Sequence, residues 1–98
     1  MKRIYISGKI TGLVYEEAFE LFEAAEEKLS NQGFLVVNPM KIEHNHDLSW
    51  ESYMKEDLKA MLDCTHVYAL RNYENSIGAM LEVDLAEKLG IKVIFEIK

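Results

Sequence analysis

Short apolar runs and longer amphipathic stretches alternate along the chain. The apolar runs are rich in β-branched and aromatic residues, a pattern that predicts strands; they cover Arg3–Ser7, Phe34–Val37, Val67–Leu70 and Ile91–Ile97. The stretches between them repeat apolar residues every three or four positions, which predicts helices; these cover Tyr15–Asn31, Trp50–Asp63 and Ser76–Leu89. Strands and helices therefore alternate from one end of the sequence to the other.

This order predicts one α/β domain over residues 1–98. Strands that alternate with helices form a parallel sheet, and right-handed crossovers place helices on both of its faces. We expect a flavodoxin-like or Rossmann-like parallel sheet of four to five strands. Ligands of such sheets bind at the carboxyl ends of the strands, near the change in strand order. The loops after the first and third strands, and Ser76, are expected at that edge.

The first predicted helix has two chemically distinct faces. Its apolar side chains share one face, which we expect in the core; they are Ala18, Leu21, Phe22, Ala25 and Leu29. Glutamates occupy the opposite face, which we expect in solvent; they are Glu16, Glu20, Glu23 and Glu27.

Two carboxylates lie at helix positions where apolar residues are expected. At about 100° per residue, Glu82 falls in the middle of an apolar arc; the arc is formed by Ile77, Leu81, Val83, Leu85, Ala86 and Leu89. Asp57 projects from the apolar arc of the preceding helix, which contains Trp50, Tyr53, Met54, Leu58, Met61 and Cys64. A carboxylate turned towards a core is costly unless it is paired or used in chemistry.

These carboxylates suggest an acid–base or nucleophile pair. Burial raises the pKa of a carboxyl group and a like charge separates two such pKa values, so one group can attack while the other handles a proton. The side chain of Glu82 leans towards Gly78, one turn earlier, where glycine leaves room for a substrate. Ser76 can present its hydroxyl and the free amides of the helix start to an anion. The alternative is that Glu82 and Asp57 are structural, hydrogen-bonded to the backbone or to other side chains.

A loop bounded by glycines follows the first strand. Gly8 and Gly12 permit tight turns at its two ends. The loop resembles a phosphate-cradling turn, but it matches neither a Walker loop nor a dinucleotide fingerprint. Lys9 is either a phosphate contact or a solvated lysine, and the spacing alone does not decide between them.

Composition argues against several classes of protein. The formal net charge is −6 and no basic run offsets it, so we expect no nucleic-acid partner. We see no signal peptide and no apolar run long enough to span a membrane, so we expect a cytoplasmic protein without a membrane partner. A single cysteine excludes an internal disulfide and fits a reducing compartment.

The metal-ligating residue types are scattered and match no strong zinc signature. They are His44, His46, Asp47, Cys64 and His66. We expect no metal and no cofactor. Cys64 lacks the positive surroundings of a catalytic thiol and is expected to be a small core residue.

Four segments carry the recognisable motifs: Tyr5–Gly12, Val37–Pro39, Asp57–Leu58 and Ser76–Glu82. The last has the pattern Ser-x-Gly-x-x-x-Glu at the start of a helix and is the most specific. Together, in this order and across nearly the whole chain, they resemble the nucleoside 2-deoxyribosyltransferase-like superfamily, and within it the small bacterial and phage DUF4406 branch.

The resemblance implies specific roles. Glu82 would be a nucleophile that attacks C1′ of a deoxyribose and forms a glycosyl-enzyme intermediate, which water or a second base resolves. Asp57 would help to protonate the leaving base and to position the nucleophile, and Ser76 would contact a 5′-phosphate, where transferases of plain nucleosides tend to carry an acidic residue. The implied substrate-binding residues are Tyr5, Ser7, Gly8, Lys9, Ile10, Thr11, Gly12, Asn38, Ser76 and Gly78.

The chain also departs from that family pattern. Monophosphate hydrolases carry serine and arginine where this chain has Lys9 and Thr11, and an aspartate is common where it has His66. The chain is shorter than the proven enzymes, which implies a homo-oligomer, a dimer or higher, with sites near the subunit interface.

The sequence therefore predicts an enzyme, an N-glycosidase or deoxyribosyltransferase, that cleaves or transfers at the N-glycosidic bond of a 2′-deoxynucleoside or its 5′-monophosphate. One alternative is a non-catalytic nucleotide-binding or regulatory module with the same fold. Another is a purely structural subunit of an assembly.

Overall fold

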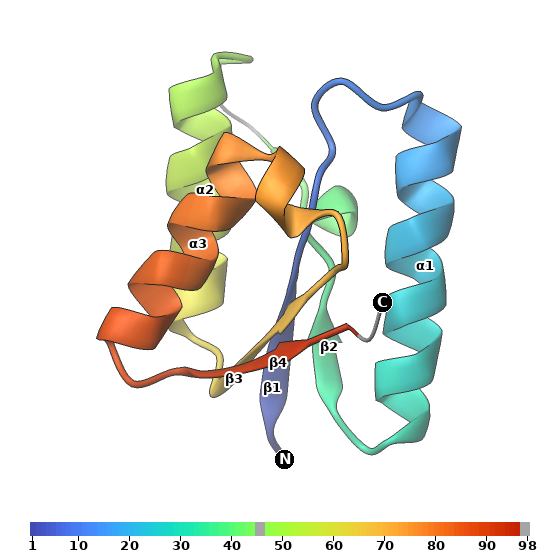
Figure 1. Cartoon of the computed structure of the whole chain (residues 1–98), viewed down its shortest axis with the longest axis vertical. Helices are drawn as coiled ribbons and strands as arrows, with labels where there is room; N and C mark the ends of the chain where they lie inside the picture. Colours follow the sequence, from blue (N-terminus) through green and yellow to red (C-terminus); the bar gives the residue numbers. More distant parts are fainter. Residues whose placement is uncertain (45–46, 97–98) are drawn as a thin grey trace.

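The computed structural model describes residues 1–44 and 47–96. In this part of the chain, three helices alternate with four strands. The elements are β1 (Arg3–Ser7), α1 (Tyr15–Asn31), β2 (Leu35–Val37), the 3-10 turn η1 (Pro39–Lys41), α2 (Trp50–Leu62), β3 (His66–Ala69), the 3-10 turn η2 (Tyr73–Asn75), α3 (Ile77–Lys88) and β4 (Lys92–Phe95). All neighbouring strands are parallel, in the order β2-β1-β3-β4 (Figure 1). The predicted α/β class is confirmed.

The helices form two layers around the sheet. Helix α1 covers one face, and α2 and α3 cover the other (Figure 1). The chain moves from β1 to β2 in one direction across the sheet and then to β3 and β4 in the other. Right-handed crossovers in opposite directions place their helices on opposite faces. The change in strand order therefore falls between β1 and β3.

Strand β1 divides its side chains between the two layers because successive residues of a strand point to opposite faces. Ile4 and Ile6 pack in the cluster that contains Phe22 of α1. Tyr5 packs in the other cluster, with Met61 of α2. Period-two alternation also sends Ser7 towards α2 and α3, which brings two polar side chains of β1 to the same layer as Glu82.

Several apolar side chains that were predicted to be buried are exposed in the structure. On α3, Ile77 is 76% exposed and Leu81 44%, so the apolar arc expected around Glu82 is displaced. The buried residues of α3 are instead Gly78, Ala79, Glu82, Val83 and Ala86. Leu35, expected in a buried strand, is 46% exposed because β2 lies at the edge of the sheet. Leu21 was expected in the core and is also exposed.

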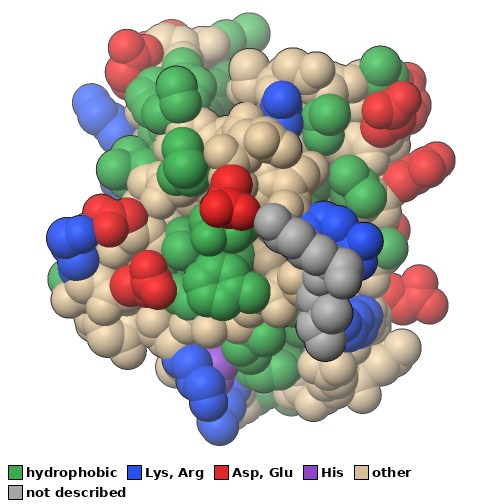
Figure 2. All heavy atoms as spheres, in the orientation of Figure 1, with side chains coloured by type: hydrophobic (Ala, Val, Ile, Leu, Met, Phe, Trp, Pro, Cys, Tyr) green, Lys and Arg blue, Asp and Glu red, His purple; other side chains and the backbone are tan. Residues whose placement is uncertain are grey.

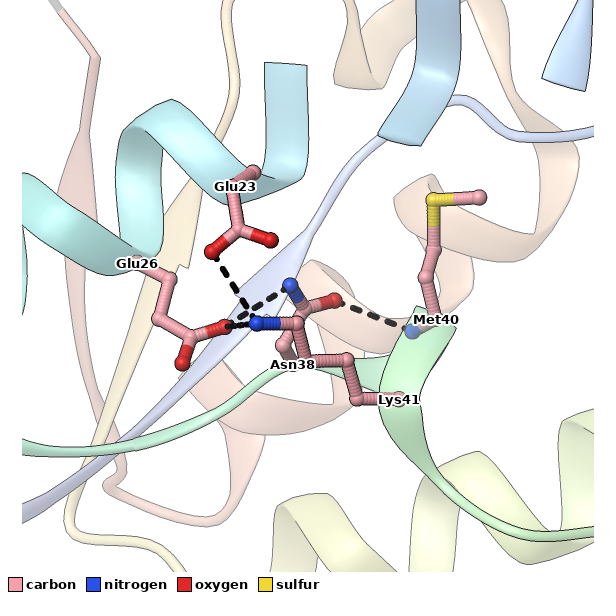
Figure 3. A network of polar contacts seen from close by, with 5 residues as sticks. All are labelled: Glu23, Glu26, Asn38, Met40 and Lys41. Carbon is pink, nitrogen blue, oxygen red and sulfur yellow. Dashed lines mark hydrogen bonds and ion pairs between the residues drawn. The ribbon is translucent and has the colours of Figure 1, made fainter. Parts of the chain in front are cut away.

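A polar network ties η1 to α1 (Figure 3). Lys41 Nζ lies 3.0 Å from Glu23 and 3.1 Å from Glu26, so Glu23 is paired rather than merely solvated. Asn38 donates from Nδ2 to Glu26 at 3.1 Å, and its Oδ1 accepts from the amide of Met40 at 3.0 Å. These contacts fix the turn that follows β2.

The described surface mixes charge and apolar groups. On the face drawn in Figure 2, acidic and basic side chains lie scattered among hydrophobic ones. Within residues 1–44 and 47–96, the helices are all too short or too polar to cross a membrane.

Candidate active site

A cavity of about 530 Å³ opens at the carboxyl end of β1, between the loop that follows this strand, η1, α2 and α3. Its position beside the change in strand order is where ligands bind in open α/β sheets. Eight of the predicted site residues line it: Tyr5, Gly8, Ile10, Thr11, Asp57, Ser76, Gly78 and Glu82. Segments far apart in the sequence therefore meet at one cavity.

Glu82 is the buried carboxylate of this cavity, and only 5% of it is exposed. Each of its oxygens accepts a hydrogen bond from β1: Oε1 from the hydroxyl of Ser7 at 2.7 Å, and Oε2 from the hydroxyl of Tyr5 at 2.8 Å. Both donors reach Glu82 because Tyr5 and Ser7 share one face of the strand. The carboxylate is thus held in a fixed orientation.

Asp57 is the second carboxyl group in the cavity lining, and it projects from the half-buried side of α2. Its Oδ1 atom is buried and has no hydrogen-bond partner among the described residues. Native structures rarely leave a buried polar atom in this state, and such atoms call for an explanation such as catalysis or a ligand.

The surroundings raise the pKa of both carboxyl groups but differ in the hydrogen bonds that they offer. Burial raises the pKa of Glu82 to about 7, and the hydrogen bonds from Ser7 and Tyr5 act against that rise. Burial, then the charge of Glu82, then that of Glu56 raise the pKa of Asp57 to about 7, with no hydrogen bond to oppose them. Both carboxyl groups therefore hold a proton more readily than an exposed carboxyl group does, and only Glu82 has donors that stabilise its charged form.

Tyr5 stays a neutral hydrogen-bond donor at physiological pH. Burial, followed by the charges of Glu82 and Asp57, raises the pKa of its hydroxyl well above 10.0. Its proton is therefore available to Glu82 throughout the pH range in which the two carboxyl groups titrate.

Ser76 begins α3 and lies in the wall of the cavity. Its Oγ accepts a hydrogen bond from the amide of Ala79 at 3.1 Å, as an N-cap residue does. The hydroxyl proton of Ser76 is not used in that bond. The amides of Ile77 and Gly78 are first-turn donors that have no acceptor inside the helix.

Gly78 allows α3 to approach α2 closely. A Cβ atom at this position would lie 2.9 Å from Sδ of Met54, closer than packed side chains normally come. The space that the sequence suggested was left for a substrate is therefore occupied by Met54 of α2. Gly78 still lines the cavity, but its missing side chain serves helix packing.

Four predicted site residues are not in the cavity lining. Ser7 lies behind Glu82, to which it donates. Asn38 is buried in the η1 network. Lys9 bonds through its amide to Asn72, and its side chain comes close to Gly12, which has a φ of 92°.

An aromatic and apolar wall completes the cavity and was not predicted as part of a site. It includes Tyr15, Met40, His44, Leu48, Trp50, Tyr53 and Met54. The rings of His44 and Tyr53 meet edge to face, with centroids 4.6 Å apart. The apolar spacing of Trp50, Tyr53 and Met54 indicated a helix face, but spacing does not distinguish a face that packs in the core from one that lines a cavity.

The candidate metal ligands that the structure describes are not assembled into a site. Among residues 1–44 and 47–96, no group of three or more His, Cys, Asp and Glu side chains is placed to hold a metal ion; His46 lies outside the described residues. Cys64 is buried, and this burial raises the pKa of its thiol to about 11. It packs in the core with Tyr5 and Met61.

Two solved structures share this fold. A 2-deoxyribosyltransferase from the psychrotolerant bacterium Bacillus psychrosaccharolyticus matches with a TM-score of 0.73 and 21% identity, over 98% of this chain and 76% of its own. A 2-deoxyribosyltransferase from Leishmania mexicana matches with a TM-score of 0.70 and 18% identity, over 97% of this chain and 63% of its own. The chain thus spans about three quarters of the first protein and less than two thirds of the second. No match was found among curated proteins.

The sequence shows the family of this chain. The family model described as domain of unknown function DUF4406 matches residues 2–95, and the chain belongs to that family. Its fold is the one that the two 2-deoxyribosyltransferases share.

Proposed function

We propose that this protein cleaves or transfers the N-glycosidic bond of a 2′-deoxynucleoside or its 5′-monophosphate, with Glu82 as the nucleophile. The observation that carries this proposal is the pair of carboxyl groups in one cavity: Glu82 with a donor on each oxygen, and Asp57 with a buried oxygen that lacks a partner. A bond to an anomeric carbon is broken most readily when one such group is ionised and the other protonated.

In the first step, an oxygen of Glu82 forms a bond to C1′ as the bond from C1′ to the base nitrogen breaks. The electron pair of that bond leaves with the base, and Asp57 gives its proton to the base. In the second step, water or another base attacks C1′, and its proton returns to Asp57. Glu82 leaves as a carboxylate, so the enzyme ends in its starting state.

The wall of the cavity supplies complementary places for the rest of the substrate. The side chains of Trp50, Tyr53 and His44 offer aromatic surface to a nucleobase. Ser76 and the first amides of α3 offer hydrogen-bond donors to a 5′-hydroxyl or a 5′-phosphate. Similarity to 2-deoxyribosyltransferases at the level of fold supports the same class of substrate.

A panel of 2′-deoxynucleosides and their 5′-monophosphates, incubated with the protein and analysed by chromatography for free base, tests this proposal. Base release is expected from at least one substrate, and Glu82→Gln is expected to lower the rate by at least about a thousandfold because no nucleophile remains. The matched control is Glu87→Gln, on the exposed side of the same helix, which should leave the rate unchanged.

Two outcomes would contradict the proposal. If no substrate releases base while a nucleotide still raises the melting temperature, the protein is a non-catalytic nucleotide-binding module. If base is released equally by Glu82→Gln, another group performs the attack.

A further inference from the structure

Ser7 makes the shorter of the two hydrogen bonds to Glu82, although it has no surface in the cavity. Its hydroxyl lies 2.7 Å from Oε1 of Glu82 and 3.3 Å from the carbonyl oxygen of Ala79. Ser7 is 1% exposed. A substrate in the cavity therefore reaches Glu82 without contacting Ser7.

The single proton of the Ser7 hydroxyl has two acceptors on α3, and their charge decides between them. A hydrogen bond to an ionised carboxylate is about twice as strong as one to a neutral carbonyl. When Glu82 is ionised, the proton goes to Oε1; when Glu82 is protonated or esterified, the carbonyl of Ala79 remains as an alternative acceptor. The bond thus favours the charged form of Glu82.

We infer that Ser7 is a positioning residue, which holds Oε1 of Glu82 from behind the cavity and keeps the negative charge on Glu82 and the proton on Asp57. This inference rests on the proposed function for its catalytic meaning. It reassigns Ser7 from a contact of the substrate to a contact of the nucleophile.

The other described groups that act on Glu82 and Asp57 are a neutral donor and two acids, so the hydrogen bond from Ser7 strongly influences which carboxyl group is charged. Tyr5 on β1 donates to Oε2, and Asp57 on α2 is the nearby like charge; Glu56 on α2 acts on Asp57 in turn. Among the described groups that influence Glu82 or Asp57, none is a cation. The location of the single negative charge therefore depends on neutral donors, and Glu82 has two of them.

The direct test is a carbon-13 NMR titration of the carboxyl groups of Glu82 and Asp57, which needs no substrate. In the wild-type protein, Glu82 is expected to titrate at lower pH than Asp57. In Ser7→Ala, the midpoint of Glu82 is expected to rise by about one pH unit, the size of one lost charge-assisted hydrogen bond, and the midpoint of Asp57 to fall. Ser30→Ala, an exposed change on α1, is the control and should move neither midpoint.

Each outcome of the titration is informative. An unchanged Glu82 midpoint in a folded Ser7→Ala protein means that Ser7 only links β1 to the carbonyl of Ala79, and the inference fails. A wild-type Glu82 that titrates above Asp57 overturns it without any variant. If Ser7→Ala does not fold, Ser7→Cys, with a weaker donor, should give a smaller shift in the same direction. The expected shifts in a protein without base-releasing activity would refute the proposed function while supporting the role of Ser7.

Discussion

Replacing Asp57 by asparagine should stabilise the protein at pH 8 and leave its stability unchanged at pH 4. Burial and the charge of Glu82 raise the pKa of Asp57 from 3.8 to about 7 in the folded protein. A carboxyl group with a raised pKa contributes stability that is complete below its unfolded pKa and is lost as the pH rises through its folded pKa. The loss falls between about pH 4 and pH 7.

The magnitude follows from that shift. About three pKa units correspond to roughly 4 kcal/mol, and because Asp57 is only half-buried, solvent screening reduces the expected gain to about 2 kcal/mol. For a domain of this size, that gain corresponds to a rise in Tm of roughly 10 °C at pH 8. The cause is removal of a charge that the folded protein solvates poorly.

Thermal unfolding of the wild type, Asp57→Asn and Asp63→Asn, followed by circular dichroism at pH 4 and pH 8, measures the effect. Asp63 is exposed just beyond α2, so its replacement should change the Tm little at either pH. An Asp57→Asn protein that is no more stable than the wild type at pH 8, or that gains the same stability at pH 4, would refute this prediction. Loss of base release by the same variant would show that the group is kept for chemistry at the expense of stability.

Three further changes test other parts of the site. Ser76→Asp keeps a good N-cap and should leave the Tm unchanged. Charge repulsion should weaken the binding of a monophosphate at least about tenfold and the binding of a nucleoside little. Equal loss of affinity for both ligands in calorimetry would contradict the phosphate assignment. Gly78→Ala should push Met54 into the cavity and lower ligand affinity. The gain in helix propensity should offset the packing strain, so that the free energy of unfolding changes by no more than about 1 kcal/mol. Unchanged affinity would mean that the side chain of Met54 moves elsewhere. Ile77, Met80 and Leu81 form an exposed apolar side of α3, where we expect the subunits of a homo-oligomer to meet. Ile77→Lys should convert that oligomer to a monomer in light scattering after size exclusion. A monomeric wild type would contradict this expectation.

Hydrophobic periodicity was sufficient to predict the elements. The bounds of β1 and α1 agree with those predicted, because each has a clear apolar pattern and a glycine near its end. Gly33, with a φ of 93°, lies just beyond the end of α1, where glycine commonly follows a helix. The carboxylate at Glu82 was also found from periodicity, since a polar residue on an apolar stripe is visible on a helical wheel.

What the sequence did not reveal depends on contacts between distant residues. The wheel of α3 is apolar over a wide arc, so it did not fix which side faces the sheet, and Ile77 proved exposed. The bond from Ser7 to Glu82 joins positions 75 residues apart, and the filling of the Gly78 space by Met54 depends on how two helices approach. No local pattern encodes either contact.

In the proposed mechanism, Glu82 attacks C1′ and carries the sugar. Intact-protein mass spectrometry after acid quench, with a 2-fluoro-substituted deoxynucleoside substrate that slows the second step, measures this directly. The wild type is expected to gain the mass of one substituted deoxyribosyl unit, located on Glu82 by peptide fragmentation, while Glu82→Gln gains none. Release of free base without any adduct on Glu82, at the same rate in both proteins, would contradict the account.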